Sequence, residues 1–562
     1  MNRLKGIPYG ISDFNRLRND NFYFVDKTIY LPLIERMPSY LSLTRPRRFG
    51  KSLFLSMMRT YYDLLQRDNF DRYFGDLWIG AHPTDQRNHY QVLYFDFSKA
   101  GCSVPGDGMM ASFNEYSSLV INQFADDYAS FYDPDFKSTV ESISSAKAKL
   151  SYIELKAKAK GYPLYLIIDE YDNFTNVILS EHGQKMFHDL THASGFYREY
   201  FKQYKGMFDR IFLMGVSPVT LDDLSSGYNI DWNISTDSRF NAMMGFSETE
   251  VREMFRYYQE NDALPGDIEA MIAEMKPWYD NYCFARMSLG DDRVFNCDMT
   301  LYYLRSQFDF HRSPEEMVDK NIRTDYSKLK MLARIDHDSA HEGSRMSTIE
   351  EIATKGEILV NLHTSFPAER VADVDNFRSL LYYYGLLTMC GTRGDRLRMC
   401  IPNHCVREQY FGFLREYYQQ AHPLDLSRLK DQIDDLAYDG VWKPFFESIA
   451  CAYRENSSVR DGMEGERNLQ GFLKAYLALA SYYLVEPELE MNYGYCDFFL
   501  LPDKQRYRTL STATSSNSNT LPALLPMRNL QCKPTKGIAN FFNTAKIKWP
   551  DNWCRGRLFT GC

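Results

Sequence analysis

A basic loop between an apolar run and a helical pattern constrains the fold of this chain more than any other stretch. Residues 40–43 (YLSL) predict a short strand, residues 44–52 (TRPRRFGKS) a tight loop, and the residues that follow a helix. In this arrangement backbone N–H groups and a helix N-terminus surround nucleotide phosphates. We therefore expect Lys51 to reach the β- and γ-phosphates of ATP and the Ser52 hydroxyl to hold Mg²⁺.

The rest of the loop supplies further candidates. The residues expected to face the nucleotide are Arg47, Arg48, Phe49, Gly50, Lys51 and Ser52. The common P-loop pattern has its first glycine five positions before Gly50, where this chain has Arg45, so the match to that pattern is incomplete. Arg45, Arg47 and Arg48 either compensate phosphate charge, contact a partner or lie in a solvated loop, and the sequence leaves these alternatives open.

Two adjacent acids end a second apolar run. Residues 162–170 (YPLYLIIDE) are apolar without alternation, which is typical of a strand buried on both faces. An ATPase needs one acid for the water shell of Mg²⁺ and a second that polarises the attacking water. Asp169 fits the first role and Glu170 the second. A core strand capped by solvated acids is the alternative for this segment alone, but its position after the basic loop favours nucleotide binding.

Two more buried strands are predicted, at residues 90–98 and 210–217. Strands that alternate with helices predict an α/β fold, with a parallel sheet covered by helices on both faces. Ser217, at the tip of the last strand, is a candidate to sense the γ-phosphate. A serine that only forms a turn is the alternative.

Six motifs along the chain point to one known family. They are FVDKT from Phe24, RPRRFGKS from Arg45, LIIDEYDNF from Leu166, MGVSP from Met214, GYNI from Gly227 and WYDNY from Trp278. Together they resemble the AAA-ATPase-like family of bacterial proteins, in which a P-loop domain precedes a domain of the PD-(D/E)XK nuclease superfamily. The family loop also reads RPRRFGKS, so Arg45 is a feature of the family. The resemblance covers residues 1–508 and implies an ATPase domain at residues 1–245 that uses ATP and Mg²⁺.

The residues after this domain predict two helical parts. Residues 246–375 are mostly helical and are interpreted as a lid that follows the ATPase sheet. Residues 376–440 predict a helix, a hairpin and a second helix, as in a winged-helix-like module. Arg393 and Arg396 at the hairpin tip could contact DNA, but many such modules serve only for packing.

Residues 441–508 resemble the first half of a PD-(D/E)XK nuclease. The resemblance implies that Glu466, on a predicted helix, and Asp497, at the start of a predicted strand, are residual metal-binding acids. A half-buried strand with a capping acid explains Asp497 equally well. The next strand of the family carries an E-x-K pair, and no such strand follows in this chain.

Residues 509–562 continue none of these patterns. Residues 511–520 (STATSSNSNT) form a polar low-complexity run, which is typical of a flexible linker. A displaced reading frame explains the run more specifically. When the codons of residues 512–520 are read in the neighbouring frame, one sequence that the genetic code allows is HSYILELKY, which is a strand pattern with E-x-K. We therefore hypothesise that this tail is out of frame, through a sequencing error or a genuine mutation.

Length, charge and cysteine spacing limit the remaining choices. A chain of 562 residues is too long for a single hydrophobic core. Its net charge of -9 argues against a generally basic surface that binds nucleic acid. Residues 1–10 lack a signal-peptide pattern and no run is long and apolar enough to span a membrane, so we expect a cytoplasmic protein. The scattered cysteines are interpreted as free thiols, and the group Cys400, His404 and Cys405 lacks the second ligand pair of a zinc site.

These observations predict an ATP-binding, ATP-hydrolysing AAA-like protein fused to an incomplete nuclease-like domain. One alternative is an ATP-regulated DNA nuclease whose E-x-K strand is lost in this chain. Another is a nucleotide-gated interaction scaffold. The expected partners are ATP, DNA through the winged-helix-like and nuclease-like regions, and further copies of the same chain.

Overall fold

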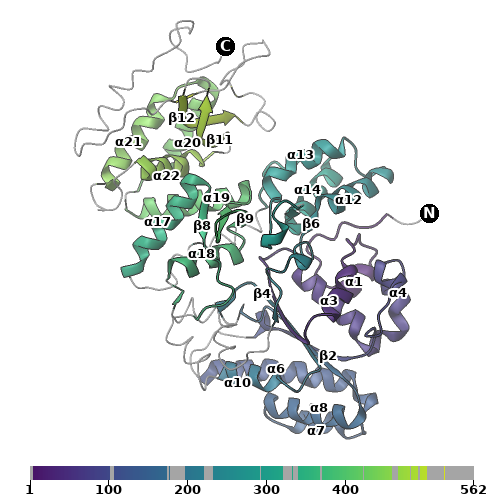
Figure 1. Ribbon diagram of the computed structural model, residues 1–562. Coiled ribbons are helices and arrows are strands. Elements are labelled where there is room, and N and C mark those ends of the chain that lie inside the picture. Colours follow the sequence, from purple (N-terminus) through teal and green to yellow (C-terminus); the bar gives the residue numbers. More distant parts are fainter. Residues whose placement is uncertain are drawn as a thin grey trace. The chain divides into compact units, whose positions relative to one another are not determined.

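The structure is a computed structural model of the whole chain (Figure 1). It describes residues 4–100, 107–173, 176, 196–219, 232–291, 293–319, 329, 332, 339–367, 370–371, 373–421, 423–457, 466–480, 482–491, 494–502, 510 and 524–525. The chain forms two compact units. The first comprises Met1–Arg323, Met331–Glu342 and Leu359–His404, and the second Thr324–Lys330, Gly343–Ile358 and Cys405–Cys562. The five domains expected from the sequence do not coincide with this division and stay predictions.

A five-stranded parallel sheet forms the centre of the first unit, in the order β2-β3-β4-β1-β5. Its strands are β1 (Tyr40–Thr44), β2 (Gln91–Asp96), β3 (Leu164–Asp169), β4 (Arg210–Gly215) and β5 (Trp232–Asn233). Every residue of β3 is buried, as expected for a parallel strand that helices cover on both faces. The predicted α/β fold with a parallel sheet is therefore confirmed.

Two of the predicted strands end earlier than the sequence indicates. The strand expected at residues 90–98 stops at Asp96, because the Asp96 carboxylate accepts a hydrogen bond from the backbone N–H of Ser98 at 3.1 Å and caps a 3₁₀ turn. The strand expected at residues 210–217 stops at Gly215, because the next two N–H groups donate to a side chain instead of the sheet. That side chain belongs to the candidate site described below.

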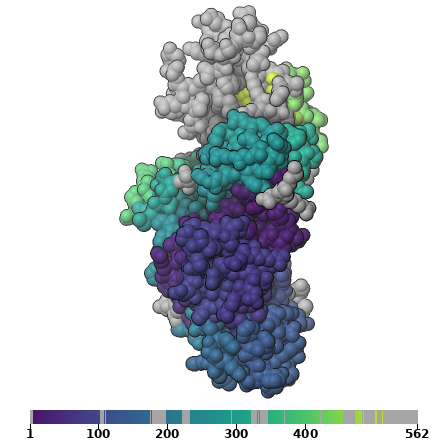
Figure 2. Space-filling view, turned by 90° about the vertical axis from the view of Figure 1, so that its right-hand side faces the viewer, coloured from purple at the N-terminus to yellow at the C-terminus, as the bar shows by residue number. Residues whose placement is uncertain are grey.

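The helices of the first unit cover this sheet in two groups. α3 (Lys51–Tyr62) packs on β2 and β3 and also against α1 (Phe14–Asn19). α6 (Asp107–Asp127) packs on β2 and on α8 (Ala146–Lys160). Figure 2 shows the surface of the first hundred residues, in purple, next to the blue surface of the second group. The sheet thus has the helix-covered construction of a P-loop-type domain.

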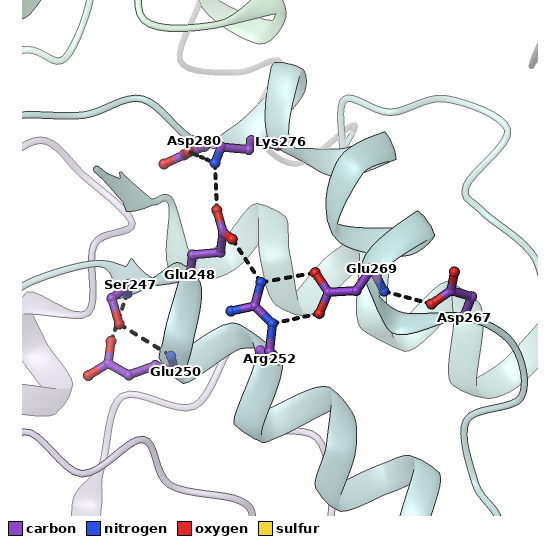
Figure 3. A network of polar contacts seen from close by, with 8 residues as sticks. All are labelled: Ser247, Glu248, Glu250, Arg252, Asp267, Glu269, Lys276 and Asp280. Carbon is purple, nitrogen blue, oxygen red and sulfur yellow. Dashed lines mark hydrogen bonds and ion pairs between the residues drawn. The ribbon is translucent and has the colours of Figure 1, made fainter. Parts of the chain in front are cut away.

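A helical subdomain follows the sheet. Its helices are α12 (Glu248–Glu260), α13 (Ile268–Tyr279) and α14 (Cys297–Phe310). Ser247 and Glu250 form a reciprocal capping box, which fixes the start of α12 (Figure 3). Arg252 forms a two-bond ion pair with Glu269 of α13, at 2.6 and 3.0 Å, so charged side chains join the two helices.

The predicted order of helix, hairpin and helix is present after this subdomain. The elements are α18 (Val374–Tyr383), β9 (Thr388–Arg393), β10 (Arg396–Cys400) and α19 (His404–Ala421). The hairpin also pairs with β8 (Glu357–Val360), so the three strands form a sheet in the order β8-β10-β9. Arg393 and Arg396 face each other in the register of the hairpin.

Helices from distant parts of the chain form the core of the second unit. α17 (Ser339–Lys355) meets α19 through a hydrogen bond from the Tyr418 hydroxyl to Glu350 at 2.9 Å. It meets α22 (Glu466–Leu477) through the buried Lys474 ammonium, which donates to the Thr354 carbonyl at 2.8 Å. The remaining helices are α20 (Leu426–Asp434) and α21 (Lys443–Ser457).

An antiparallel sheet in the order β11-β12-β13 completes this unit. Its strands are β11 (Tyr483–Met491), β12 (Gly494–Pro502) and β13 (Leu524–Leu525). Apart from β13 and residue 510, the tail that we hypothesise to be out of frame lies outside the described residues. None of the helices that the structure describes is long and apolar enough to cross a membrane.

Candidate active site

The basic loop connects β1 to α3, as predicted. Two of its residues have left-handed backbone conformations, with φ of 68° at Arg48 and 85° at Gly50. Such angles suit glycine, but they are uncommon for arginine and occur mainly where the surrounding structure imposes them. Gly50 directly precedes the first turn of α3. The helix N-terminus with its N–H groups therefore opens toward the loop, where phosphates are commonly bound.

Arg45 is not one of the residues that face this site. Its side chain is 1% exposed, and its guanidinium donates to the carbonyls of Thr44, Ser235 and Phe240 at 2.7–2.9 Å. The guanidinium also lies 4.4 Å from the ring centre of Phe284. Burial lowers the pKa of Arg45 to about 10, so it stays charged at neutral pH. The three alternatives from the sequence, a phosphate contact, a partner contact and a solvated residue, are therefore wrong for Arg45, because its buried charge joins the start of the loop to the segment of residues 235–240.

The loop residues after Arg45 point in different directions. The Phe49 ring is buried edge-on against the rings of Tyr282 and Phe284, at centroid distances of 4.8 and 5.5 Å. Arg48 forms an ion pair with Asp298 of α14 at 3.1 Å. The Phe49 ring is thus held by aromatic packing and the Arg48 guanidinium by an ion pair, so what Phe49 can offer a nucleotide is its backbone.

Lys51 folds back over the loop. Its side chain is 5% exposed, and its ammonium donates to the Pro46 carbonyl at 3.1 Å. A lysine whose ammonium lies over its own loop is positioned to form an ion pair with a phosphate bound there.

Ser52 and Asp169 contact each other at the carboxyl ends of the strands. The Ser52 hydroxyl donates to the Asp169 carboxylate at 2.6 Å, and the Tyr94 hydroxyl of β2 donates to the same oxygen at 3.3 Å. Burial raises the pKa of Asp169 to about 6, against the opposing effect of the Ser52 hydrogen bond. Carboxylate and hydroxyl oxygens are the donors that Mg²⁺ prefers, so the residues present fit this ion.

Glu170 follows at the tip of β3 in a left-handed conformation, with φ of 53°. Its backbone N–H donates to the Asp169 carboxylate at 3.0 Å, which fixes the two acids relative to each other. Non-glycine residues in this conformation are concentrated at functional sites. Glu170 is also less buried than Asp169, so its carboxylate remains accessible to water.

Asp172 is the functional candidate that sequence reasoning missed. Its carboxylate accepts hydrogen bonds from the N–H groups of Val216 at 3.1 Å and Ser217 at 2.6 Å, just past the end of β4. A Cβ atom at Gly215 would lie 2.2 Å from the same carboxylate, so only glycine allows this approach. The sequence contains two hints of this contact, namely a second acid in the DEYDNF motif and a glycine at the end of a predicted strand.

The position of Ser217 follows from the strand order. Because β4 lies between β1 and β3, the tip of β4 lies between the loop and the two acids of β3. This placement also shows that the strand of Asp169 is not the direct neighbour of β1 but lies one strand further away. The structure thus brings together Lys51, Ser52, Asp169, Glu170 and Ser217 at the carboxyl ends of the strands, where open α/β sheets bind ligands.

A mainly apolar cavity of about 80 Å³ adjoins the loop on the side of α14. Three segments line it: residues 8–27 before the sheet, the start of α3, and residues 243–301 of the helical subdomain. Representative lining residues are Ile11, Phe24, Gly50, Leu53, Met244 and Cys297.

The acids of the expected nuclease site lie in the second unit. Glu466 is the first residue of α22 and Asp497 lies within β12. Their side chains are outside the described part of the structure.

Comparisons with known proteins agree with this division of the chain. Residues 8–225 match the family described as predicted AAA-ATPase, and residues 464–512 match the PD-(D/E)XK nuclease superfamily. Two segments of the chain therefore match an AAA-ATPase-like family and the PD-(D/E)XK nuclease superfamily, and the resemblance stated from the motifs is confirmed.

One curated relative is a protein of Azotobacter chroococcum mcd 1 described as "Uncharacterized protein in vnfD 5'region". It is 29% identical to this chain over 318 residues, which are 54% of this chain and 53% of the relative. The chain thus spans about half the length of this relative. No solved structure matches the chain.

Proposed function

We propose that the first unit binds ATP with Mg²⁺ and hydrolyses it. The observation that carries this proposal is the 2.6 Å hydrogen bond between Ser52 and Asp169, which unites two motifs that lie 117 residues apart in the chain. A helix N-terminus that follows Gly50, a buried lysine and two adjacent acids at the carboxyl ends of the strands are the parts that phosphoryl transfer requires. The match of residues 8–225 to an ATPase family supports the same conclusion.

Each residue has a distinct proposed role. Lys51 exchanges its bond to the Pro46 carbonyl for the β- and γ-phosphates. Ser52 and Asp169 hold Mg²⁺, which neutralises charge on the phosphates when it is bound. Glu170 accepts a proton from the attacking water, and Ser217 donates to the γ-phosphate from the tip of β4. Arg47 and the backbone of residues 48–50 complete the phosphate site.

The apolar cavity beside the loop is the proposed site of the base. It begins at Gly50, so a nucleotide whose phosphates lie on the loop can direct its base into this cavity. Apolar side chains from both sides of the cavity would cover the faces of the ring.

Binding is tested with a fluorescent ATP analogue and Mg²⁺. We expect Lys51→Ala to weaken binding by at least about 100-fold, because the loop loses its charge on the phosphates. Lys158→Ala is the matched control, since Lys158 is an exposed lysine on α8 and its loss should leave the affinity unchanged. Equal affinity of Lys51→Ala and the unaltered chain would refute the proposal.

DNA cleavage is not proposed for this chain. No glutamate follows Glu490 in the sequence, so the E-x-K pair of the superfamily cannot be formed by the residues after Asp497. We propose instead that the reading frame changes near residue 508 and that a chain with the neighbouring frame is an ATP-regulated nuclease. Resequencing the gene across the codons of residues 507–520 tests this, and an unchanged frame would contradict it.

The remaining expectations are proposals of the same kind. They are a cytoplasmic location, self-association, and DNA contact through the hairpin β9–β10 and the nuclease-like segment. Analytical ultracentrifugation with and without ATP tests self-association directly.

A further inference from the structure

Ser217 lies just beyond the end of β4, and side chains instead of a neighbouring strand bind its backbone. Its N–H donates to the Asp172 carboxylate at 2.6 Å, and its carbonyl accepts a hydrogen bond from the Tyr171 hydroxyl at 2.8 Å. Ser217 is buried, so unpaired peptide groups at this position would be costly. Two adjacent side chains of another segment therefore fix both backbone groups of this residue.

Tyr171 spans the tip of β4. Its own N–H donates to the Met214 carbonyl at 3.2 Å, and its hydroxyl reaches the Ser217 carbonyl three residues further along. Its ring lies on Gly215, where a Cβ atom would come within 2.6 Å of a ring carbon. The side chain is fully buried, so the ring and its hydroxyl are held in one position along the end of the strand.

The segment that holds Ser217 also carries the proposed base. Glu170, in its left-handed conformation, directly precedes Tyr171. Asp172 follows, and its carboxylate also accepts a hydrogen bond from the N–H of Val216 at 3.1 Å. Three consecutive residues thus supply the proposed base for water and both groups that hold the proposed γ-phosphate sensor. The placement of Ser217 relative to Glu170 therefore depends on these short contacts.

We propose that Tyr171 is a positioning residue for ATP hydrolysis, which fixes the Ser217 backbone so that the Ser217 hydroxyl meets the γ-phosphate. This inference rests on the proposed function. The Ser217 hydroxyl accepts a hydrogen bond from the N–H of Val219 at 3.3 Å, so it can donate its proton in another direction. That direction follows from the position of the backbone, which Tyr171 holds at the carbonyl.

Tyr171→Phe tests the inference, because it removes the hydroxyl and keeps the ring on Gly215. Tyr279→Phe is the matched control, since the buried Tyr279 hydroxyl of α13 also donates to a backbone carbonyl, that of Met317, at 2.7 Å. Both substitutions are made in the full-length chain and again in a Ser217→Ala background. The measurements are phosphate release at saturating ATP, affinity for the fluorescent analogue and the apparent melting temperature.

We expect Tyr171→Phe to lower the turnover number at least about tenfold, in the range of a misplaced group at a reacting centre. Its ATP affinity should stay within about twofold, because the contacts of the loop with the nucleotide are kept. In the Ser217→Ala background Tyr171→Phe should change turnover less than about twofold, because the hydroxyl that Tyr171 positions is already absent. Tyr279→Phe should lower the melting temperature about as much as Tyr171→Phe and leave turnover unchanged.

Four results would overturn the inference. Turnover of Tyr171→Phe equal to that of the unaltered chain, with Glu170→Gln inactive, refutes the role of Tyr171 and leaves the proposed function intact. The same loss of turnover with and without the Ser217 hydroxyl shows that Tyr171 does not act through Ser217. A parallel fall in affinity, melting temperature and turnover assigns Tyr171 to packing instead. An unaltered chain that releases no phosphate above Glu170→Gln overturns the inference together with the proposed hydrolysis.

Discussion

The Ser52 hydroxyl donates a hydrogen bond of 2.6 Å to the carboxylate of Asp169, which joins the start of α3 to the tip of β3. Asp169 ends β3, whereas Ser52 follows β1, and these two strands are not neighbours because β4 lies between them. Their contact therefore depends on the register of β1, β4 and β3. It also places a hydroxyl and a carboxylate where a divalent cation with bound phosphates can replace the shared proton.

Asp169→Asn should remove the dependence of ATP binding on Mg²⁺. The amide keeps the shape of the side chain, but it is a weaker ligand for a hard cation than a carboxylate. We expect the gain in ATP affinity on adding Mg²⁺, measured against a chelator, to disappear in this variant. Asp68→Asn, at an exposed position, is the control and should keep the gain. A full Mg²⁺ response in Asp169→Asn would show that the metal is held elsewhere.

Arg45→Ala should destabilise the first unit without a direct effect on phosphate contacts. The substitution leaves the carbonyls of Thr44, Ser235 and Phe240 without their shared donor and opens a cavity beside Phe284. Losses of this kind cost about 3–5 kcal/mol. Thermal unfolding measures the change, and Arg36→Ala, at an exposed site, should stay within about 0.5 kcal/mol of the unaltered chain. A small effect at Arg45 would contradict the structural role assigned here.

Gly215→Ala should disrupt the tip of β4. The added methyl group would lie 2.2 Å from the Asp172 carboxylate, which must then release the N–H groups of Val216 and Ser217. We expect a loss of about 1–3 kcal/mol in stability, together with a fall in ATP turnover. Gly412→Ala is the control, because nothing lies within 4 Å of a Cβ atom there and α19 should gain stability from alanine. Unchanged turnover in Gly215→Ala would separate the Asp172 contact from catalysis.

Asp280→Asn should change how stability depends on pH. Burial raises the pKa of Asp280 to about 6 from its ordinary value of 3.8, although Lys276 lies 3.9 Å away. Between these two values the folded chain binds more protons than the unfolded chain, so this group reduces stability as pH rises toward 6. The amide cannot ionise and removes this loss.

The melting temperature of Asp280→Asn, compared with that of the unaltered chain, should therefore rise more at pH 7.5 than at pH 4.5. An equal difference at both pH values would show that the Asp280 carboxylate does not have a raised pKa in the folded protein.

Local patterns in the sequence predicted the parts of the site that depend on neighbours along the chain. The buried run of β3 predicted the position of Asp169 and Glu170, and the strand, loop and helix pattern predicted Lys51 and Ser52. The ends of β2 and β4 were predicted too late in the sequence. Each strand stops where a carboxylate accepts hydrogen bonds from the backbone N–H groups that follow, and for β4 this carboxylate comes from the segment after β3. The apolar pattern of a strand does not indicate which side chain will bind the N–H groups at its end.

Contacts between distant segments could not be predicted in this way. Arg45 looked like a solvated or phosphate-binding residue, because its carbonyl partners at Ser235 and Phe240 lie 190 and 195 residues away. Gly385 follows an ordinary helical pattern, and its close packing on Pro46 joins segments that lie far apart in the sequence. Such contacts follow only from the assembled fold.

The most direct test of the account is the rate of phosphate release from ATP in the presence of Mg²⁺, measured for the unaltered chain and for Glu170→Gln. The account predicts turnover by the unaltered chain and a loss of at least about 100-fold in Glu170→Gln, with ATP still bound, because the amide cannot accept the proton of the attacking water. Equal rates in the two proteins would contradict hydrolysis at this site.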